Sequence, residues 1–261
     1  MTVIALSGGA PNTFDGEPPD RVCRRPTRAE LHAYPCLGSA TPARGRALVY
    51  AGGGYLRLVH DKEGVEIARW LNTLGLDAYV LVHRLPGQDG HPVDIALQDG
   101  LLALDHLATL APLPLLHVGL SSGGHLAGVM ACQRHDLKSA GAVIAYAPLN
   151  ANHRSHKFPA GKPDFLPPEK QAFYDAWPIG IATEPHGLPH CPVFLAYALH
   201  DPIVPIAHAL NLLQAAQAHA LDVEAHVFPQ AEHGFALREL AGTHDQWPVL
   251  VARWLQARLA R

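Results

Sequence analysis

The sequence predicts an α/β fold in which helices cover both faces of a mostly parallel sheet. Short apolar runs rich in β-branched residues alternate with stretches whose apolar residues recur at helical spacing. Such strand–helix alternation is typical of parallel sheets. The composition is that of a globular protein, with 48% hydrophobic and 16% charged residues, and 261 residues suffice for one large domain. We therefore expect residues 1–261 to form a single domain.

The expected elements follow one another from residue 29 to residue 259. An antiparallel strand is expected over 29–35, ahead of the parallel series. The parallel strands are expected at 47–50, 77–82, 114–118, 142–146, 192–197 and 223–228. The helices are expected at 62–74, 94–110, 125–132, 206–220 and 245–259. Gly75 ends the first helix, and the last helix carries its tryptophans and aliphatic residues on one face.

One segment interrupts this alternation. Residues 148–192 contain nine of the 23 prolines, mixed with polar and aromatic residues, and show little periodicity. A segment of this length suits an excursion above the carboxyl edge of the sheet, so we expect a lid or substrate-binding insertion. An irregular surface loop is the alternative.

Charge and composition limit the classes of partner. The formal net charge of −3 gives no electrostatic reason to expect nucleic acid or an anionic membrane as a partner. Residues 1–6 have no basic residue and too short an apolar run for a signal peptide, so none is expected there. Polar residues and prolines interrupt the apolar stretch 101–120, so no membrane span is expected. The four cysteines lie far apart, and a Cys23–Cys36 bridge is left open. We expect a cytoplasmic protein whose oligomeric state the sequence does not indicate.

The most informative motif is Gly119-Leu-Ser-Ser-Gly123, which fits the pattern G-x-S-x-G. It lies between an expected strand and an expected helix, where a serine is forced onto a tight turn and its hydroxyl is presented at the top of a sheet. Glycines flank the serine because a side chain there would collide with the neighbouring strand and helix. Centring the motif on Ser122 would put Leu120 at a glycine position, so Ser121 is the expected nucleophile.

Two later residues occupy the places where partners of this serine are expected. A serine hydroxyl needs a histidine to take its proton and an acid to orient that histidine. In sheets of this type the chain order is serine, acid, histidine. Asp201 follows the strand at 192–197, and His233 follows the last strand. The rival acids are less well placed, since Asp222 precedes its strand and Glu232 is too close in sequence to the histidine. We therefore expect Asp201 as the acid.

A glycine-rich loop follows the strand at 47–50. It reads Ala51-Gly-Gly-Gly-Tyr55, and three glycines let the main chain approach a substrate with its N–H groups turned inward. The tetrahedral intermediate of acyl transfer needs such backbone donors for its oxyanion. The N–H of Ser122, at the start of the helix after the nucleophile, is a further expected donor.

These segments together resemble the α/β-hydrolase carboxylesterases of the acetyl esterase and acetylxylan esterase type, which are more distantly related to hormone-sensitive-lipase-like enzymes. The resemblance runs from about residue 47 to residue 237. The segments that carry it are Ala51-Gly-Gly-Gly-Tyr55, Lys62-Glu-Gly64, His83-Arg-Leu-Pro86, Gly119-Leu-Ser-Ser-Gly-Gly-His-Leu-Ala127, Asp201-Pro-Ile-Val-Pro205 and Glu232-His-Gly-Phe235.

The resemblance implies an α/β-hydrolase fold and a role for each site residue. Ser121 would be the nucleophile, His233 the general base and acid, and Asp201 its orienting partner. The oxyanion would be bound by Gly53, Gly54 and Ser122. Two positions depart from the family pattern: Ala51 stands where relatives carry histidine or proline, and His83 replaces the usual tyrosine before Arg84.

Other signals are weaker. The candidate metal ligands are His153, His156, His186, His190 and His200. None of them falls on an expected helix at a spacing typical of metal ligands, so we expect neither a metal nor another cofactor. Arg84 and Asp99 are expected to form a structural ion pair. Among the aromatic residues that could line a substrate pocket, Tyr55 and Trp177 are the candidates, although packing is as good an interpretation.

The sequence therefore predicts a serine carboxylesterase that hydrolyses short-chain acyl esters through an acyl-enzyme on Ser121, with acetylated or feruloylated carbohydrate as a candidate substrate. A serine peptidase of the prolyl-oligopeptidase type is the first alternative because such catalytic domains share this architecture. A non-catalytic binding protein that keeps the fold is the second.

Overall fold

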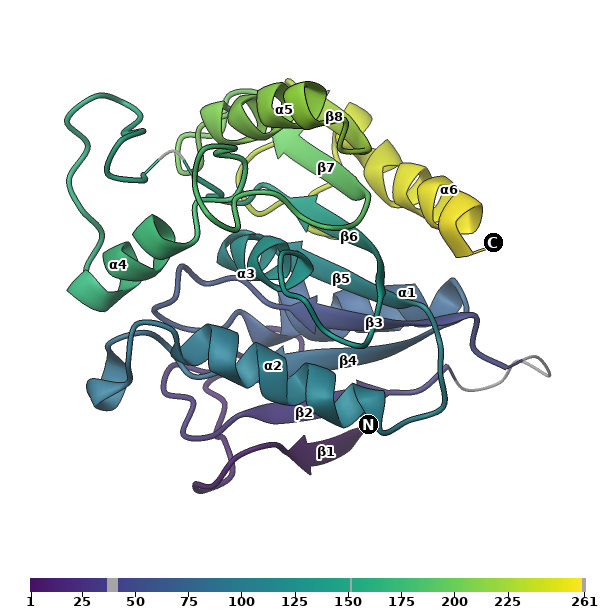
Figure 1. The fold of residues 1–261 in the computed structure, drawn as a ribbon. Helices are drawn as coiled ribbons and strands as arrows, with labels where there is room; N and C mark the ends of the chain where they lie inside the picture. The colour runs from purple at the N-terminus through teal and green to yellow at the C-terminus, as the bar shows by residue number, and fades with distance from the viewer. Residues whose placement is uncertain (37–41, 151, 260–261) are drawn as a thin grey trace.

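The computed structural model describes residues 1–36, 42–150 and 152–259, and its centre is an eight-stranded sheet in the order β1-β2-β4-β3-β5-β6-β7-β8 (Figure 1). The first two strands pair antiparallel, and β2 is also antiparallel to β4, whereas all later pairs are parallel. The strands are β1 Thr2–Ala5, β2 Glu30–Tyr34, β3 Gly45–Tyr50, β4 Leu76–Val82, β5 Leu115–Leu120, β6 Ser139–Ala145, β7 Val193–Ala198 and β8 Val223–Phe228.

Helices cover both faces of this sheet. In Figure 1, α2 and α3 lie in front of the strands and α1 lies behind them. The helices are α1 Glu66–Thr73, α2 Ile95–Ala108, α3 Ser122–Ala131, α4 Pro168–Ala176, α5 Ala207–His219 and α6 Trp247–Leu259, with shorter turns η1 Asp61–Val65, η2 Gln88–Gly90 and η3 Thr243–Gln246. The predicted α/β architecture is confirmed.

Strand β3 shows how the sequence produces two cores. Its residues are all buried, because both faces of the sheet are covered. Leu48 and Tyr50 belong to the apolar cluster that α2, α3 and α5 share, whereas Ala47 and Val49 belong to the cluster of α1 and α6. Successive side chains point to opposite faces of a strand, so one short apolar run contributes to both cores.

Several elements differ from the prediction. Strand β1 was not expected, and it is the exposed edge strand beside β2. Helix α4 lies inside the segment 148–192, where no helix was expected; Pro168 stands in its first turn, and Phe173 and Tyr174 bury one side of it. The sequence features that could have predicted this helix are the proline pair at its start and the two aromatic residues that follow it. The helix predicted at 62–74 starts as the π-helical turn η1 before it continues as α1.

The strand order places two loops side by side. Strands β4 and β5 flank β3, and the connecting helices α1 and α2 pack on opposite faces. Loops after neighbouring parallel strands meet at the carboxyl edge, and ligands of open α/β sheets bind where the winding changes direction. The glycine loop follows β3 and Ser121 follows β5, so both lie at this switch point. In Figure 1 the arrowheads of β6 and β7 point toward the side on which α4 stands.

Candidate active site

Ser121 lies on a strained turn between β5 and α3. Its φ of 52° and ψ of −128° are rare for a residue with a side chain. Close packing requires the glycines beside it: a Cβ on Gly119 would lie 2.2 Å from the carbonyl oxygen of Gly123, and a Cβ on Gly123 would lie 2.0 Å from that of Tyr50. The Ser121 N–H donates to Ala145 O at 3.0 Å, which fixes the turn to β6. This is the backbone geometry that the motif predicts.

A continuous chain of hydrogen bonds connects Ser121, His233 and Asp201. The Ser121 hydroxyl Oγ lies 3.1 Å from His233 Nε2, and His233 Nδ1 lies 2.7 Å from Asp201 Oδ2. The aspartate side chain is completely buried, whereas the imidazole keeps 20% of its side-chain surface exposed. This geometry allows the histidine to accept the serine proton while the carboxylate fixes the orientation of the ring.

Asp201 also organises its own loop. Its Oδ1 accepts the N–H groups of Ile203 at 2.8 Å and Val204 at 2.9 Å, so Oδ2 alone remains for the histidine. The rival acids lie elsewhere: Asp222 pairs with Arg258 at 2.7 Å, and Glu232 is exposed. The hydrogen bonds with which Asp201 caps its own turn therefore coexist with its contact to His233.

The glycine loop adopts an unusual conformation. Gly53 has a φ of 130° and Gly54 a φ of 70°, and a Cβ on Gly53 would lie 2.2 Å from the carbonyl oxygen of Arg57. These conformations favour glycine. The N–H of Gly54 donates to the Ser122 hydroxyl at 2.8 Å, so an oxyanion at this amide has to replace that hydroxyl. Ser122 itself is the first residue of α3, where backbone N–H groups are free of intrahelical partners.

Glu63 is a site residue that sequence reasoning did not assign, although its segment contributed to the family resemblance. Its carboxylate accepts the N–H of Gly52 at 2.9 Å and the hydroxyl of Tyr146 at 3.1 Å. Burial raises the pKa of Glu63, although the hydrogen bond from Tyr146 and the nearby His233 oppose that rise. The Glu63 carboxylate thus fixes the Gly52 amide at the start of the glycine loop. A buried carboxylate with these contacts depends on tertiary structure and has no local sequence signal.

Tyr55 lies in the core, which corrects our expectation that it contacts substrate. Its side chain is 2% exposed and packs edge-on against Phe173 with ring centroids 5.4 Å apart. Its hydroxyl bonds to His125 Nδ1 at 2.9 Å. The other nitrogen of that imidazole, Nε2, lies 2.8 Å from the carbonyl oxygen of Trp177. Because a carbonyl can only accept, Nε2 carries the proton, and Tyr55 donates to Nδ1.

Trp177 ends α4 and is partly buried, with its indole ring 4.8 Å from the His186 ring. Its backbone is therefore tied to α3 through His125, while its substrate contact stays a prediction. The expected ion pair of Arg84 and Asp99 is confirmed at 2.6 Å. His83, which replaces the family tyrosine, is buried and lies 2.9 Å from Arg84 O through Nδ1.

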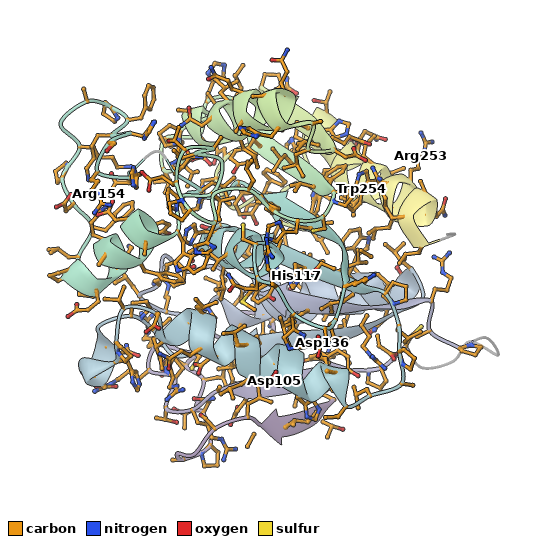
Figure 2. All side chains as sticks on the ribbon, viewed as in Figure 1. Asp105, His117, Asp136, Arg154, Arg253 and Trp254 are labelled. Carbon is orange, nitrogen blue, oxygen red and sulfur yellow. The ribbon has the colours of Figure 1, made fainter. Side chains whose placement is uncertain are left out.

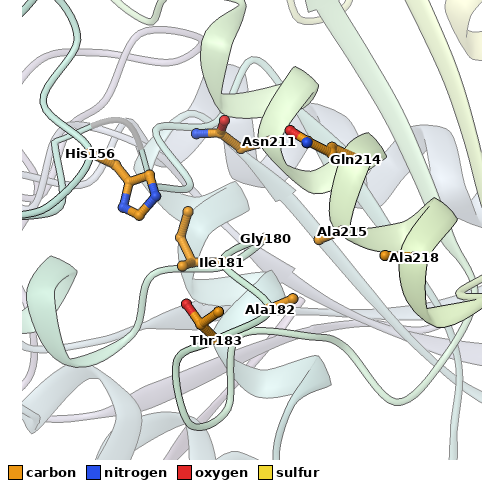
Figure 3. Close-up of a pocket in the computed structure, with 9 residues that line it drawn as sticks. All are labelled: His156, Gly180, Ile181, Ala182, Thr183, Asn211, Gln214, Ala215 and Ala218. Carbon is orange, nitrogen blue, oxygen red and sulfur yellow. The ribbon is translucent and has the colours of Figure 1, made fainter.

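Two surface cavities lie at different places relative to the hydrogen-bond chain. A cavity of about 570 Å³ is lined by His233 together with residues of the loops after β7 and β8, including His200 and Ile203. Another, of about 270 Å³, lies between the segment around Ile181 and α5, and none of Ser121, His233 and Asp201 lines it (Figure 3). Of these two cavities, only the first borders the hydrogen-bond chain, through His233.

The described residues hold few other chemical groups of note. The four cysteines are free, so Cys23 and Cys36 do not form a bridge. Within residues 1–36, 42–150 and 152–259, no three His, Cys, Asp or Glu side chains gather in a way that could hold a metal ion. No helix in this part of the chain is both long and apolar enough to cross a membrane.

The sheet order, the strained serine turn and the loops that carry an acid and a histidine define an α/β hydrolase. The chain belongs to the prolyl oligopeptidase family, whose model matches residues 97–257. The match begins in α2 and ends in α6, and it includes the three residues of the hydrogen-bond chain.

Comparison with known proteins gives both a sequence relative and structural neighbours. An acetylxylan esterase of Xylanibacter ruminicola is 26% identical over 224 residues, which are 82% of this chain and 46% of that protein. This chain thus spans less than half of that relative's length. An acetyl ester-xyloside bifunctional hydrolase from Caldicellulosiruptor lactoaceticus has a TM-score of 0.70 at 22% identity, covering 98% of this chain and 96% of its own. A carboxylesterase from Lactobacillus plantarum has a TM-score of 0.71 at 20% identity over 98% of both chains. The two structural likenesses establish the fold.

Proposed function

We propose that this protein is a serine carboxylesterase that hydrolyses short-chain acyl esters. The observation that carries the proposal is the hydrogen-bond chain from Ser121 through His233 to Asp201, at 3.1 and 2.7 Å. The acetylxylan esterase from Xylanibacter ruminicola supports acetylated carbohydrate as the substrate class. Feruloylated carbohydrate is a second candidate ester.

The reaction is a double displacement. His233 takes the proton of Ser121 as the hydroxyl oxygen attacks the ester carbonyl, and Asp201 stabilises the resulting imidazolium. The alcohol leaves with the proton from His233, which gives an acyl-enzyme. His233 then activates water, and the acid product is released from the serine.

The oxyanion of each tetrahedral intermediate needs donors at a fixed place. We assign this role to the backbone N–H groups of Gly53, Gly54 and Ser122. For Gly54 the Ser122 hydroxyl must first turn away from the amide, to which it is bonded at 2.8 Å. Donors already held by the protein lower the barrier because they need no reorganisation during the reaction.

The segment 148–192 is proposed to form the upper wall of the site within a single domain. Its helix α4 stands at the carboxyl edge of the sheet, and Trp177 connects it to α3 through His125. A substrate that enters above Ser121 would meet this segment, including Trp177.

We further propose a cytoplasmic location, since the four cysteines are free as in reducing compartments. The proposed partner is a small ester rather than nucleic acid.

Replacement of the nucleophile tests the proposal. Ser121→Ala is expected to lower kcat for 4-nitrophenyl acetate by about three orders of magnitude or more, because the covalent route is lost. Ser155→Ala, on the exposed part of the 148–192 segment, is the matched control and retains activity. If Ser121→Ala hydrolyses the ester as fast as the wild type, the proposal fails.

The alternatives are tested with other substrates and a covalent probe. A peptidase, the activity in the family's name, would cleave peptide anilides faster than aryl esters, and we expect the opposite order. A non-catalytic binding protein would leave Ser121 unlabelled by a fluorophosphonate. We expect the probe to label Ser121 in the wild type and not in Ser121→Ala.

A further inference from the structure

Lys170 places an ammonium group beside the glycine loop. It belongs to α4, and although lysine is normally exposed, only 8% of this residue is accessible. A Cβ built on Gly54 would lie 3.8 Å from Lys170 Nζ, and that atom is the nearest group it would meet. The ammonium group therefore borders the loop to which we assign oxyanion binding.

The ammonium group has no carboxylate partner among the described residues. No acidic oxygen of residues 1–36, 42–150 or 152–259 forms an ion pair with it, and its recorded contact is with the Phe165 ring, whose centroid lies 4.6 Å from Nζ. Lys162 approaches the same ring at 5.3 Å, also without an ion pair in the described part of the chain. An aromatic face attracts a cation but supplies no counter-charge.

Nearby acidic side chains are occupied elsewhere. Asp164 pairs with Lys157 at 2.6 Å, and Asp175 accepts the N–H of Arg154 at 2.8 Å. The Glu169 carboxylate lies against Gly87, where a Cβ would approach its Oε2 to 2.4 Å. The segment thus contains several acidic residues, but among the described residues none of their carboxylates forms an ion pair with Lys170.

Burying an unpaired ammonium group is costly, and a second cation close to it adds repulsion. Burial, and to a lesser extent Lys162, lower the pKa of Lys170 to about 8. The group therefore stays mostly protonated at pH 7. Binding of an anion beside this unpaired charge is therefore favourable.

We propose that Lys170 binds a negatively charged group of the substrate, namely a carboxylate carried by the acyl or the alcohol part of the ester. This inference rests on the proposed function, because the substrate lies beside the glycine loop only when its carbonyl is placed for attack by Ser121. It narrows the substrate class to esters that carry an acidic group near the scissile bond. Lys162 supplies additional positive potential from the same side.

Two pairs of esters that differ in charge test this inference. On the alcohol side, 4-acetoxybenzoate is compared with 4-acetoxybenzamide; on the acyl side, 4-nitrophenyl hydrogen glutarate is compared with its methyl ester. A charge-assisted hydrogen bond contributes enough to predict a preference of about tenfold or more in kcat/KM for the anionic member of one pair. The pair that shows the preference identifies the part of the substrate that carries the charge.

The variants separate charge recognition from other roles. Lys170→Met is expected to abolish the preference, and Lys170→Arg to retain it. Lys157→Met, whose lysine is already paired with Asp164, is the matched control and keeps the wild-type ratio. If the wild type treats both members of both pairs alike, or if Lys170→Met lowers both members of a pair equally, the inference is wrong. The second outcome is what a lysine that acted on the oxyanion itself would give.

Binding of 4-hydroxybenzoate, measured by calorimetry on the wild type and on Lys170→Arg, gives a readout that needs no turnover. We expect 4-hydroxybenzoate to bind at least about tenfold more tightly than 4-hydroxybenzamide if the alcohol part carries the charge, and monomethyl glutarate to bind by the same factor more tightly than dimethyl glutarate if the acyl part carries it. Equal affinities within both pairs overturn the inference even if Lys170→Met fails to fold. If the wild type hydrolyses none of the four esters, the proposed function fails, and the calorimetric comparison still decides whether the site takes an anion.

Discussion

The hydroxyl of Tyr55 donates to His125 Nδ1 across 2.9 Å in the interior of the protein. Tyr55 ends the glycine loop with a φ of 56°, and His125 lies in the first turns of α3. The same imidazole donates to the carbonyl oxygen of Trp177. One buried ring therefore connects the glycine loop, α3 and the end of α4.

This relationship predicts a loss of stability in Tyr55→Phe. The change leaves the buried Nδ1 of His125 without a donor, which costs about 1–3 kcal/mol. Urea unfolding measures the free energy. Tyr174→Phe is the matched control, because that buried tyrosine lies in the same aromatic group and has no hydrogen bond from its hydroxyl among the described residues. Equal losses in both variants would show that the hydrogen bond contributes nothing.

Removal of the charge on the acid should cost catalysis and leave the fold intact. Asp201→Asn keeps an oxygen for the turn amides of Ile203 and Val204 but weakens the contact that orients His233. We expect kcat for 4-nitrophenyl acetate to fall by about 10³- to 10⁴-fold, as in other triads. Asp222→Asn, at the ion pair with Arg258, is the control. A larger effect from Asp222 than from Asp201 would reverse our choice of acid.

Glu63 is expected to position the glycine loop. Glu63→Ala leaves the Gly52 N–H without its buried acceptor, so the loop shifts and its donors lose their alignment. Since we propose that those donors bind the oxyanion of the transition state, kcat should fall about tenfold or more with little change in KM. Glu63→Gln retains an acceptor and should recover most of kcat. The control Glu66→Ala removes a surface carboxylate that pairs with Arg238. A change confined to KM would argue for a contact with substrate instead.

Stability should decrease as the pH falls below about 6.5. Burial lowers the pKa of His117 and of His125 to about 4. The unfolded chain takes up protons on these imidazoles near pH 6.5, whereas the folded protein does so only near pH 4, so the unfolded state binds more protons in between. Each such histidine contributes a slope of about 1.4 kcal/mol per pH unit over that window.

Urea unfolding at pH 7, 6 and 5 measures this slope. His117 lies in the middle of β5, bonded to the Tyr50 hydroxyl and to Ser139, and it is labelled near the centre of the molecule in Figure 2. His117→Gln should reduce the slope by about one proton. His219→Gln, at an exposed position of α5, should leave the slope as in the wild type. A free energy of unfolding that is constant from pH 7 to pH 5 would contradict the prediction.

The flanking glycine of the serine turn should tolerate no side chain. A Cβ at Gly123 would lie 2.0 Å from the backbone oxygen of Tyr50, so Gly123→Ala must separate α3 from β3. Overpacking of this kind destabilises by about 3 kcal/mol. Gly8→Ala is the control, because nothing lies within 4 Å of a Cβ there. Thermal unfolding of both variants measures the difference, and equal midpoints would mean that the turn is not close-packed.

Most of the strands and helices could be predicted from the sequence, although β1 and α4 were missed, and so could the three residues that meet in the hydrogen-bond chain. Strands and helices follow from local apolar periodicity, and the G-x-S-x-G turn combines a local backbone requirement with its place between β5 and α3. Asp201 and His233 were predictable because the chain order of such sheets specifies which loops end beside the serine. The family resemblance supported the same residues.

The surroundings of the site depend on tertiary packing and could not be predicted from the sequence. Tyr55 was expected to contact substrate and is buried, whereas Glu63 and Lys170 were not assigned and lie against the glycine loop. Each of these placements depends on contacts between segments far apart in the chain, and a residue type alone does not fix its burial or its partners. A tyrosine, a glutamate or a lysine acquires its role from the side chains that pack around it, and that packing exists only when the sheet has brought its loops together.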